Sequence, residues 1–288
     1  MRPYIIAALA VAVLPFACFA QEDPGNLEDD EEMLTPAEAA EAYSLSVARL
    51  MLKMAGVGKG DVLYDLGCGD GRVAITGASE FGCRGVGIDT DHIRLEQGRQ
   101  NARKAGVSDR VEFIETDLGS VPLSSASVVS LYLLPRQSAA IRPKLLAELK
   151  PGTRLVARDF DLGEWKPDGQ ARLGDSRVYY WIVPSNVSGT WVWQGGRQRY
   201  SMKVDQVFQK GTASLAAFPA QGKAVSLRVE ADKILFTISL EYAARERTIN
   251  FEGTVTGDIM QGFAEEEGIR TPWKAVRKPG TMRPIDGS

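Results

Sequence analysis

The sequence is poor in the residues from which many metal and redox sites are built. It has a single histidine, His92, and three cysteines in 288 residues. Neither Cys68 nor Cys83 lies in a CxxC motif or a Cys/His cluster, so we expect no metal site. Blocks of lysine and arginine with interleaved aromatics are also missing, and the net charge is only −3. The composition therefore argues against nucleic acid as a main partner.

The N-terminal segment has the layout of a targeting signal. It reads MRPYIIAALAVAVLPFACFAQ, with a positive charge at Arg2, an apolar run from Tyr4 to Leu14 and small residues ending at Ala20. The run is shorter than the roughly 20 residues that span a membrane. We therefore expect a signal peptide over residues 1–20, cleavage between Ala20 and Gln21, and an exported, periplasmic protein. An uncleaved N-terminus is the alternative, and only this form would associate with a membrane.

Charge and helix signals mark the start of the ordered chain. Residues 21–34 are largely acidic with little to bury, so we expect a disordered tether. Thr35 can cap a helix, Pro36 fits its first turn, and Glu38 completes a capping box. Apolar residues then keep helical spacing up to Gly56.

Strands and amphipathic helices alternate in the segment 35–185. We expect strands at DVLYDLG, GVGID, VEFIETD, ASVVSLYLL and TRLVARDF, a last strand at VYYWIVP, and further helices over Gly71 to Phe81, Asp91 to Ala105 and Ser138 to Leu149. Apolar strands that alternate with helices predict right-handed crossovers and a parallel sheet covered on both faces. The fold class is therefore α/β, with a doubly wound, Rossmann-like domain.

The segment 186–288 shows strand patterns alone. About eight short strands, beginning with GTWVWQ and ending with PWKAVR, are separated by turns with Gly, Asp or Lys. This pattern predicts a small antiparallel β-barrel or sandwich, used as a binding or interaction module. Aromatic side chains at alternating positions would fill its core: Trp191, Trp193, Phe208, Phe236, Phe251 and Trp273. A barrel that encloses a small ligand is the alternative.

A glycine-rich turn follows the first strand, in the segment DLGCGDG. Gly67, Gly69 and Gly71 permit positive φ and a close backbone approach to a ligand, with Cys68 as a small residue in the turn. The spacing G-x-G-x-G differs from the G-x-G-x-x-G of a nicotinamide-binding loop. Asp65 and Asp70 flank the turn and would repel a pyrophosphate but attract an ammonium or a sulfonium. The turn therefore predicts a cationic ligand.

Two further acids end the next two strands. Asp89 lies about 20 residues past the turn, where a carboxylate can accept the hydroxyls of a ribose. Asp117 ends the third strand, where it can accept hydrogen bonds from an adenine amino group. Together with the turn, these acids predict a nucleoside ligand that carries an amino acid or a sulfonium.

These motifs resemble those of the class I S-adenosylmethionine-dependent methyltransferases. The segments VLYDLGCGDGRVAI, RGVGIDTD, VVSLYLLPR and RPKLLAELKPGTRLVARDFDLGEW, read in order, look like bacterial relatives of one small family. Its mitochondrial members methylate lysines of the adenine nucleotide translocase and of the ATP synthase. The resemblance implies S-adenosylmethionine as cofactor, bound by Asp65, Gly67, Cys68, Gly69, Gly71, Asp89 and Asp117, and a protein lysine as acceptor.

Methyl transfer needs alignment of donor and acceptor more than it needs a histidine. A carboxylate or an aromatic wall can hold an amine in line or ease its deprotonation. Asp159, at the end of the fifth strand, and Tyr132, at the end of the fourth, are the catalytic candidates, and the resemblance supports Asp159. Trp165 is either a cover of the site or a packing residue. His92 is expected at the surface near the adenine.

Two other functions fit the same residues. The enzyme could methylate a small molecule that the C-terminal domain delivers or selects. An exported chain could also keep the fold as a scaffold without turnover, since S-adenosylmethionine is made in the cytosol. The full set of ligand positions favours an active methyltransferase.

Overall fold

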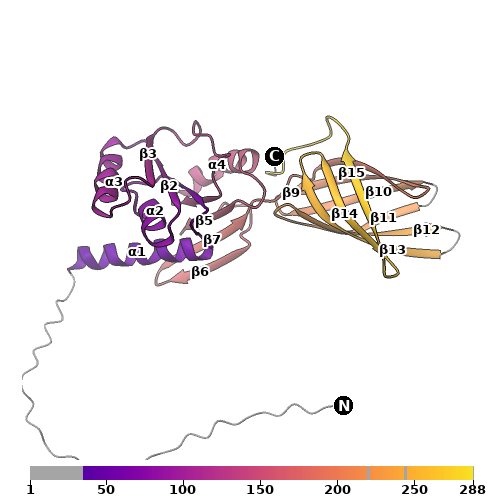
Figure 1. The fold of residues 1–288 in the computed structure, drawn as a ribbon, viewed down its shortest axis with the longest axis horizontal. Coiled ribbons are helices and arrows are strands. Elements are labelled where there is room, and N and C mark those ends of the chain that lie inside the picture. Colours follow the sequence, from indigo (N-terminus) through magenta and orange to yellow (C-terminus); the bar gives the residue numbers. More distant parts are fainter. Residues whose placement is uncertain (1–34, 219–220, 243–244, 288) are drawn as a thin grey trace, which may run out of the picture.

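A computed structural model describes residues 35–287 except 219–220 and 243–244, so the expected signal peptide and acidic tether lie outside the described residues. Figure 1 shows an α/β domain beside a barrel of long strands. The predicted fold class is confirmed, and the barrel rather than the sandwich is formed. Within these residues, no helix has the length and apolar character that a bilayer crossing requires.

The first helix, α1 (Pro36–Met54), begins where the capping pattern predicts. The Thr35 hydroxyl accepts the Glu38 N–H at 3.3 Å, and Glu38 Oε2 accepts the Thr35 N–H at 2.8 Å. Each side chain thus satisfies one backbone donor that the helix leaves unpaired. The helix lays Val47 and Met51 against the sheet, where both are buried.

Five parallel strands form most of the α/β sheet. They are β1 (Val62–Leu66), β2 (Arg84–Asp89), β3 (Val111–Glu115), β4 (Val128–Leu131) and β5 (Arg154–Arg158), and they lie in the order β3-β2-β1-β4-β5. The order reverses direction at β1, so the space above the ends of β1 and β4 is where such a fold binds ligands.

Helices cover both faces of this sheet. They are α2 (Arg72–Thr76), which continues as the π-helix η1 (Gly77–Phe81), α3 (His92–Lys104) and α4 (Pro135–Glu148). Helix α4 begins three residues before the predicted start, because Pro135 fits its first turn and Gln137 Oε1 accepts the Leu134 N–H at 3.0 Å. Strand β4 is shorter than predicted at both ends.

The last two strands of the sheet depart from the prediction. Strand β7 (Ser176–Ile182) pairs with β5 in antiparallel orientation, and an edge strand that the sequence did not indicate, β6 (Gly169–Leu173), pairs with β7. The connection from β5 to β7 forms this hairpin strand instead of a helix, so the chain returns antiparallel. The sheet is therefore mixed rather than fully parallel.

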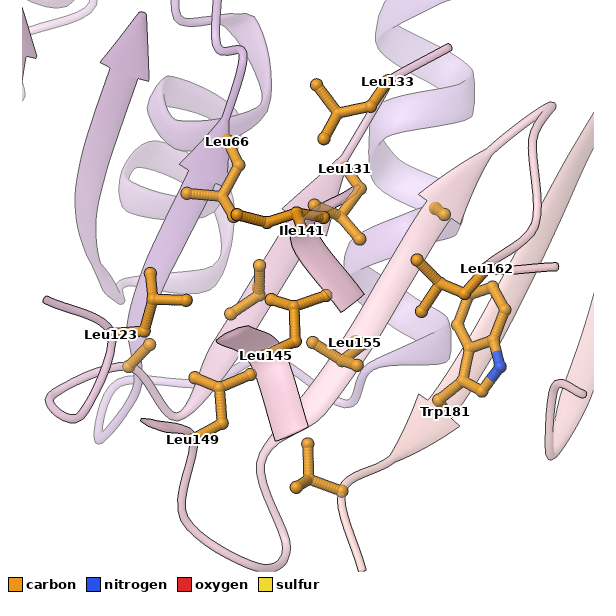
Figure 2. Close-up of a cluster of buried hydrophobic side chains, with 14 of the residues drawn as sticks. Leu66, Leu123, Leu131, Leu133, Ile141, Leu145, Leu149, Leu155, Leu162 and Trp181 are labelled. Carbon is orange, nitrogen blue, oxygen red and sulfur yellow. The ribbon is translucent and has the colours of Figure 1, made fainter. Parts of the chain in front are cut away.

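The core of the α/β domain lies between the sheet and α4. Figure 2 shows Ile141 and Leu145 of α4 above Leu66, Leu131 and Leu155 of three adjacent strands, and all five are buried. Helices α1, α2 and α3 pack on the opposite face, around Leu63, Val128 and Phe113. Apolar packing thus fixes the strand ends from both sides.

All eight predicted strands of the C-terminal domain are present and close into an antiparallel barrel. They are β8 (Gly189–Gly195), β9 (Gln198–Val207), β10 (Lys210–Phe218), β11 (Gln221–Glu230), β12 (Lys233–Tyr242), β13 (Arg245–Thr256), β14 (Ile259–Glu266) and β15 (Ile269–Arg277). The pairs β15–β8 and β10–β11 close the barrel, with Val276 opposite Val192 and Lys210 opposite Arg228.

Aromatic rings fill the barrel interior. The Phe236 and Phe251 rings stack with centroids 4.5 Å apart, and Trp193 stacks on Tyr200 at 4.7 Å. Trp273 packs edge-on against Phe236 at 5.4 Å. These contacts favour the packed-core interpretation over the ligand-holding barrel.

Phe208, predicted in the barrel core, belongs elsewhere. It follows β9 at a turn residue with φ +53° and stacks on Trp165 of the α/β domain with centroids 5.9 Å apart. Trp165 is fully buried there, and its Nε1–H donates to Gln209 Oε1 at 2.8 Å. Trp165 is therefore a packing residue at the junction of the domains and not a cover of the predicted site.

The C-terminal tail returns to this junction, as the position of the C-terminus in Figure 1 shows. The Ile285 carbonyl accepts the Phe208 N–H at 2.8 Å, and the Ile285 side chain is buried. The Arg283 carbonyl accepts hydrogen bonds from the Asn186 amide and the Ser188 hydroxyl, both at 2.7 Å. The tail thus ties the barrel end to the segment that connects the domains.

Candidate functional site

The glycine turn has the backbone geometry that its sequence predicts. Gly67, Gly69 and Gly71 all have positive φ, between 54° and 78°. A Cβ atom at Gly71 would lie 2.5 Å from the ring of Phe113. Any side chain there would therefore combine backbone strain with a steric clash.

Asp89 fixes the turn against the neighbouring strand. One carboxylate oxygen accepts the Gly69 N–H at 2.9 Å, and the other accepts the Asp91 N–H at 3.0 Å. Asp91 in turn caps α3 through its own carboxylate. Asp89, the residue predicted to bind a ribose, thus has a defined structural role. Each of its carboxylate oxygens keeps a lone pair for a further hydrogen-bond donor.

A cavity of about 440 Å³ opens beside the turn, at the carboxyl ends of β1 and β4. Helix α1 forms one wall of it, and the turn with the first residues of α2 and α3 forms another. The wall residues are Ser44, Val47, Ala48 and Met51 from α1; Asp65, Gly67, Cys68, Gly69 and Asp70; Arg72, Val73, Arg94 and Gln97; and Leu131, Tyr132 and Arg158.

Asp65 is a buried acid of the cavity wall, and one of its carboxylate oxygens has no hydrogen-bond partner. Ser130 Oγ donates to its Oδ1 at 2.6 Å. The backbone of Ala74 favours the charged form of Asp65, but no described group makes a hydrogen bond of normal geometry to Oδ2. Burial, together with the charges of Asp70 and Asp89, raises the pKa of Asp65 to about 6. An orphaned carboxylate oxygen of this kind is a fitting partner for an ammonium group.

The other polar residues of the turn are already satisfied. Arg72 donates to both oxygens of Asp70, at 3.2 and 2.7 Å. Burial opposes ionisation of Asp70, but this guanidinium outweighs it and holds the pKa of Asp70 below its usual range. Burial raises the pKa of the Cys68 thiol, so Cys68 is a neutral wall residue rather than a nucleophile.

Tyr132 lines the cavity, and a cation already lies over the face of its ring. The Arg158 guanidinium carbon is 5.0 Å from the ring centroid, and Phe160 stacks against the same tyrosine at 6.4 Å. Arg158 also donates from Nη1 to Ser44 Oγ of α1 at 3.3 Å. The aromatic wall that the sequence predicted is therefore a stack of aromatic and guanidinium groups.

Asp159 does not line the cavity. Its φ of +62° turns the side chain so that one oxygen accepts the Arg177 N–H at 2.9 Å and the other accepts Arg158 Nε–H at 3.1 Å. The carboxylate stands behind Arg158 as seen from the cavity. Its role as the group that activates the acceptor stays a prediction.

The remaining predicted residues, Asp89, Asp117 and His92, lie outside the cavity wall. Asp117 accepts the Gly119 N–H at 2.7 Å, in the loop that follows β3. His92 is exposed and pairs with Glu115 at 2.8 Å, which agrees with its predicted place at the surface. The binding roles of Asp89 and Asp117 stay predictions.

Sequence reasoning missed Arg158, Ser44 and Gln97. Arg158 stands directly before the predicted acid Asp159 in the segment TRLVARDF, where the end of a strand marks both residues as candidates. Only acids and aromatic residues were considered as catalytic candidates at the strand ends, so Arg158 was not predicted. Ser44 carried no signal, because nothing in the sequence of a helix shows which sheet edge it covers.

The donor set of the cavity wall fits an organic zwitterion better than a metal ion. Among the described residues, no cluster of three or more histidines, cysteines and acids could hold a metal. The wall instead offers an unpaired carboxylate oxygen, backbone groups of a glycine turn and guanidinium groups. These groups match the ammonium and carboxylate of an amino-acid moiety such as that of S-adenosylmethionine.

Known proteins with similar sequences are methyltransferases. The model of the ANTKMT methyltransferase domain family matches residues 65–169. A protein-lysine N-methyltransferase of Saccharolobus islandicus (strain REY15A) is 37% identical over 142 residues, which is 48% of this chain and 88% of the relative. Adenine nucleotide translocase lysine N-methyltransferase of Mus musculus is 33% identical over 127 residues, 44% of this chain and 55% of the relative.

A solved structure is similar over part of the chain. It is an RNA methyltransferase from Salinibacter ruber in complex with S-adenosyl-L-homocysteine, with 46% identity and a TM-score of 0.49. It covers 49% of this chain and 93% of the solved chain. The family model ends at residue 169, before the barrel begins.

Proposed function

We propose that this chain, which belongs to the ANTKMT-type family of class I S-adenosylmethionine-dependent methyltransferases, methylates the side-chain amine of a lysine in a protein. The enzyme class and its cofactor follow from the family. The acceptor is the part that we propose, since relatives of this family are named for lysine methylation.

The observation that carries the cofactor part of the proposal is the unpaired Oδ2 of Asp65 beside the glycine turn. A buried carboxylate oxygen without a hydrogen-bond partner destabilises the fold unless a ligand supplies the missing donor. The ammonium of the cofactor's amino-acid part supplies such a donor. The orphan oxygen therefore supports a cofactor site in use rather than a scaffold that has lost its ligand.

The cofactor contacts divide between two sides of the turn. Asp65, Gly67 and Gly69 would hold the amino-acid part, with Cys68 in van der Waals contact. Asp89 and Asp117, at the ends of the next two strands, would hold ribose and adenine. When bound, S-adenosylmethionine supplies a methyl group: the lone pair of the acceptor nitrogen forms the new N–C bond, the S–C bond breaks, and its electron pair stays on sulfur.

The protein's own contribution is alignment and the exclusion of water. Helix α1 covers the cavity with Val47, Ala48 and Met51, which are apolar. Leu131 and Tyr132 also line the cavity, so a lysine side chain that enters beside them would contact apolar groups and lose part of its water. An extended aliphatic chain with one terminal amine suits such a slot.

Calorimetry and mass spectrometry test the proposal together. Residues 21–288 should bind S-adenosylmethionine and S-adenosylhomocysteine with micromolar affinity, and Asp89→Ala should lose it. Incubation with S-adenosylmethionine should methylate lysine side chains of poly-L-lysine, read as methyl-lysine after hydrolysis. Cofactor binding without any methylated amine would overturn the lysine proposal and favour a small-molecule acceptor. If the protein binds neither S-adenosylmethionine nor S-adenosylhomocysteine, only the alternative of a scaffold without turnover remains.

Export of the enzyme is a separate proposal, supported by the layout of residues 1–20. N-terminal sequencing of the protein purified from its native cells should begin at Gln21. A native N-terminus at Met1 would contradict cleavage and favour the anchored form.

A further inference from the structure

The cavity wall is richer in positive than in negative charge. Among its described residues, three carry guanidinium groups, Arg72, Arg94 and Arg158, and two carry carboxylates, Asp65 and Asp70. Arg72 neutralises Asp70, and Arg94 is largely exposed beside Asp91. Arg158 is different, because its side chain is only 20% exposed and lines the cavity between Ser44 and Tyr132.

Three contacts hold the Arg158 guanidinium in place. Nε donates to Asp159, Nη1 donates to Ser44, and the planar group lies over the Tyr132 ring. The contacts come from the residue after β5, from α1 and from the residue after β4, so three segments of the chain fix the position of the cation. A fixed charge in a partly desolvated place acts more strongly on its neighbours than a mobile one in water.

Neither carboxylate of the described cavity wall is left to accept a proton from a lysine once the proposed cofactor is bound. Asp70 is held by Arg72, and the unpaired Oδ2 of Asp65 would take the ammonium of the cofactor. Asp159 lies outside the wall, where Arg158 and the Arg177 N–H occupy its two oxygens. A lysine ammonium is nevertheless unreactive until it loses its proton. The deprotonation must therefore be favoured by something other than a nearby base.

We propose that Arg158 is the activating residue of the acceptor site: its positive charge disfavours the ammonium form of an entering lysine and so favours the neutral, nucleophilic amine. The proton leaves to solvent before the amine is enclosed. Like charge and desolvation act in the same direction on an amine. The inference rests on the proposed lysine acceptor and names how that acceptor is activated.

Asp159 then acts as a positioning residue. It holds Arg158 Nε while its second oxygen is held by the backbone of Arg177. Because the carboxylate does not reach the cavity wall, the acceptor meets the cation first. The charged and titratable groups around the acceptor position come from every element that packs there. In addition to Arg158, they are Asp159 after β5, Tyr43 on α1, Asp65 on β1, Cys68, Asp70 and Arg72 at the turn, Arg94 on α3 and Tyr132 after β4.

The test is the pH dependence of methylation in three variants. Arg158→Met removes the charge at similar length, Arg158→Lys keeps it, and Arg136→Met removes an exposed charge from α4 as the matched control. Methyl transfer to poly-L-lysine is measured at saturating cofactor from about pH 7 to about pH 10.5, which spans the ordinary lysine pKa. Calorimetric titration with S-adenosylhomocysteine is run on the same proteins.

We expect Arg158→Met to be about tenfold slower near pH 7.5 and to approach the wild-type rate within about twofold at pH 10.5, because alkali replaces the lost activation. Arg158→Lys should keep most of the wild-type profile, Arg136→Met all of it, and cofactor affinity should stay within about twofold. A fall that is equal at every pH would overturn the inference and leave Arg158 a structural role.

Two further outcomes separate this inference from its premise. A tenfold or larger loss of S-adenosylhomocysteine affinity in Arg158→Met would mean that the guanidinium holds the cofactor's carboxylate. This result would also overturn the inference that Arg158 activates the acceptor. A wild-type enzyme that binds cofactor but methylates no lysine would instead overturn the proposed function itself.

Discussion

The interiors of the two domains differ in how completely side chains fill them. In the barrel, Phe236, Phe251, Trp193 and Trp273 fill the space between the strands with stacked and edge-on rings. In the α/β domain, apolar packing stops at the strand ends and leaves a cavity with a buried, half-satisfied acid, Asp65. The barrel interior is filled by packed rings, whereas the α/β domain leaves a cavity with an unpaired buried oxygen at its proposed cofactor site.

This contrast separates what stabilises the protein from what it does. Substitutions in the barrel core should cost stability and leave the cofactor site intact. Substitutions at the strand ends should do the reverse, and one of them should even stabilise the fold. Four variants test that division, from the largest expected effect to the smallest.

Phe236→Ala should give the largest loss of stability. Phe236 is 2% exposed and packs between Phe251 and Trp273, so its truncation leaves a cavity in the barrel and costs about 3–5 kcal/mol. Differential scanning calorimetry measures the loss, with the half-exposed Phe263→Ala as a control that should change little. Below the melting temperature, affinity for S-adenosylhomocysteine should be unchanged; a parallel loss of affinity would show that the domains depend on one another.

Asp65→Asn should stabilise the fold and remove cofactor binding. The pKa of Asp65 is raised from 3.8 to about 6, so ionisation costs stability as the pH rises through this interval. Two pH units correspond to about 3 kcal/mol at pH 7, which the variant regains. Urea unfolding at pH 7.5 should show the gain and at pH 4 almost none, with the exposed Asp109→Asn as control. Retained cofactor affinity would show that the orphan oxygen is not the ammonium site.

Gln209→Leu should loosen the junction of the domains by a smaller amount. It removes the acceptor of the buried Trp165 Nε1–H, which costs about 1–2 kcal/mol. Thermal unfolding should show the loss, whereas Gln194→Leu, at an exposed barrel position, should not. An unchanged melting temperature would mean that water replaces the lost bond.

His92→Gln should have the smallest effect. The hydrogen bond and charge of Glu115 raise the pKa of His92, so the pair stabilises the fold below the ordinary histidine pKa and is lost as the pH rises through the folded value. Both side chains are exposed, so little stability is at stake. Urea unfolding at pH 5.5 and 8.5 should differ from wild type only at the lower pH, and cofactor affinity should stay within about twofold. A large loss of affinity would place the imidazole in the site.

Much of the fold could be predicted from periodicity, and the misses have local causes. The eight barrel strands were found because each keeps apolar residues on alternate positions between polar turns. Strand β6 was missed because GQARL is short and mostly polar at the edge of the sheet. The antiparallel return of β7 had a signal that was not used: no helix pattern separates it from β5.

The site was predicted at the level of strand ends but not of side-chain direction. Asp65 and Tyr132 do line the cavity, because both lie at the carboxyl ends of the adjacent central strands β1 and β4. Asp159 does not, since its left-handed backbone turns it toward Arg177, and a sequence carries no sign of such a conformation for an aspartate. Phe208 was misplaced for the same reason, since its φ of +53° breaks the alternation of β9.

The returning C-terminal tail has a mechanical consequence. A barrel joined to the neighbouring domain by a single chain segment could rotate about that segment. Here the Arg283 carbonyl accepts hydrogen bonds from Asn186 and Ser188 in the connecting segment, and the Ile285 carbonyl accepts the N–H of Phe208, whose ring stacks on Trp165 of the α/β domain. The tail therefore supports both the connecting segment and the turn through which the barrel contacts its neighbour, and this support restricts rotation of the barrel about the connection.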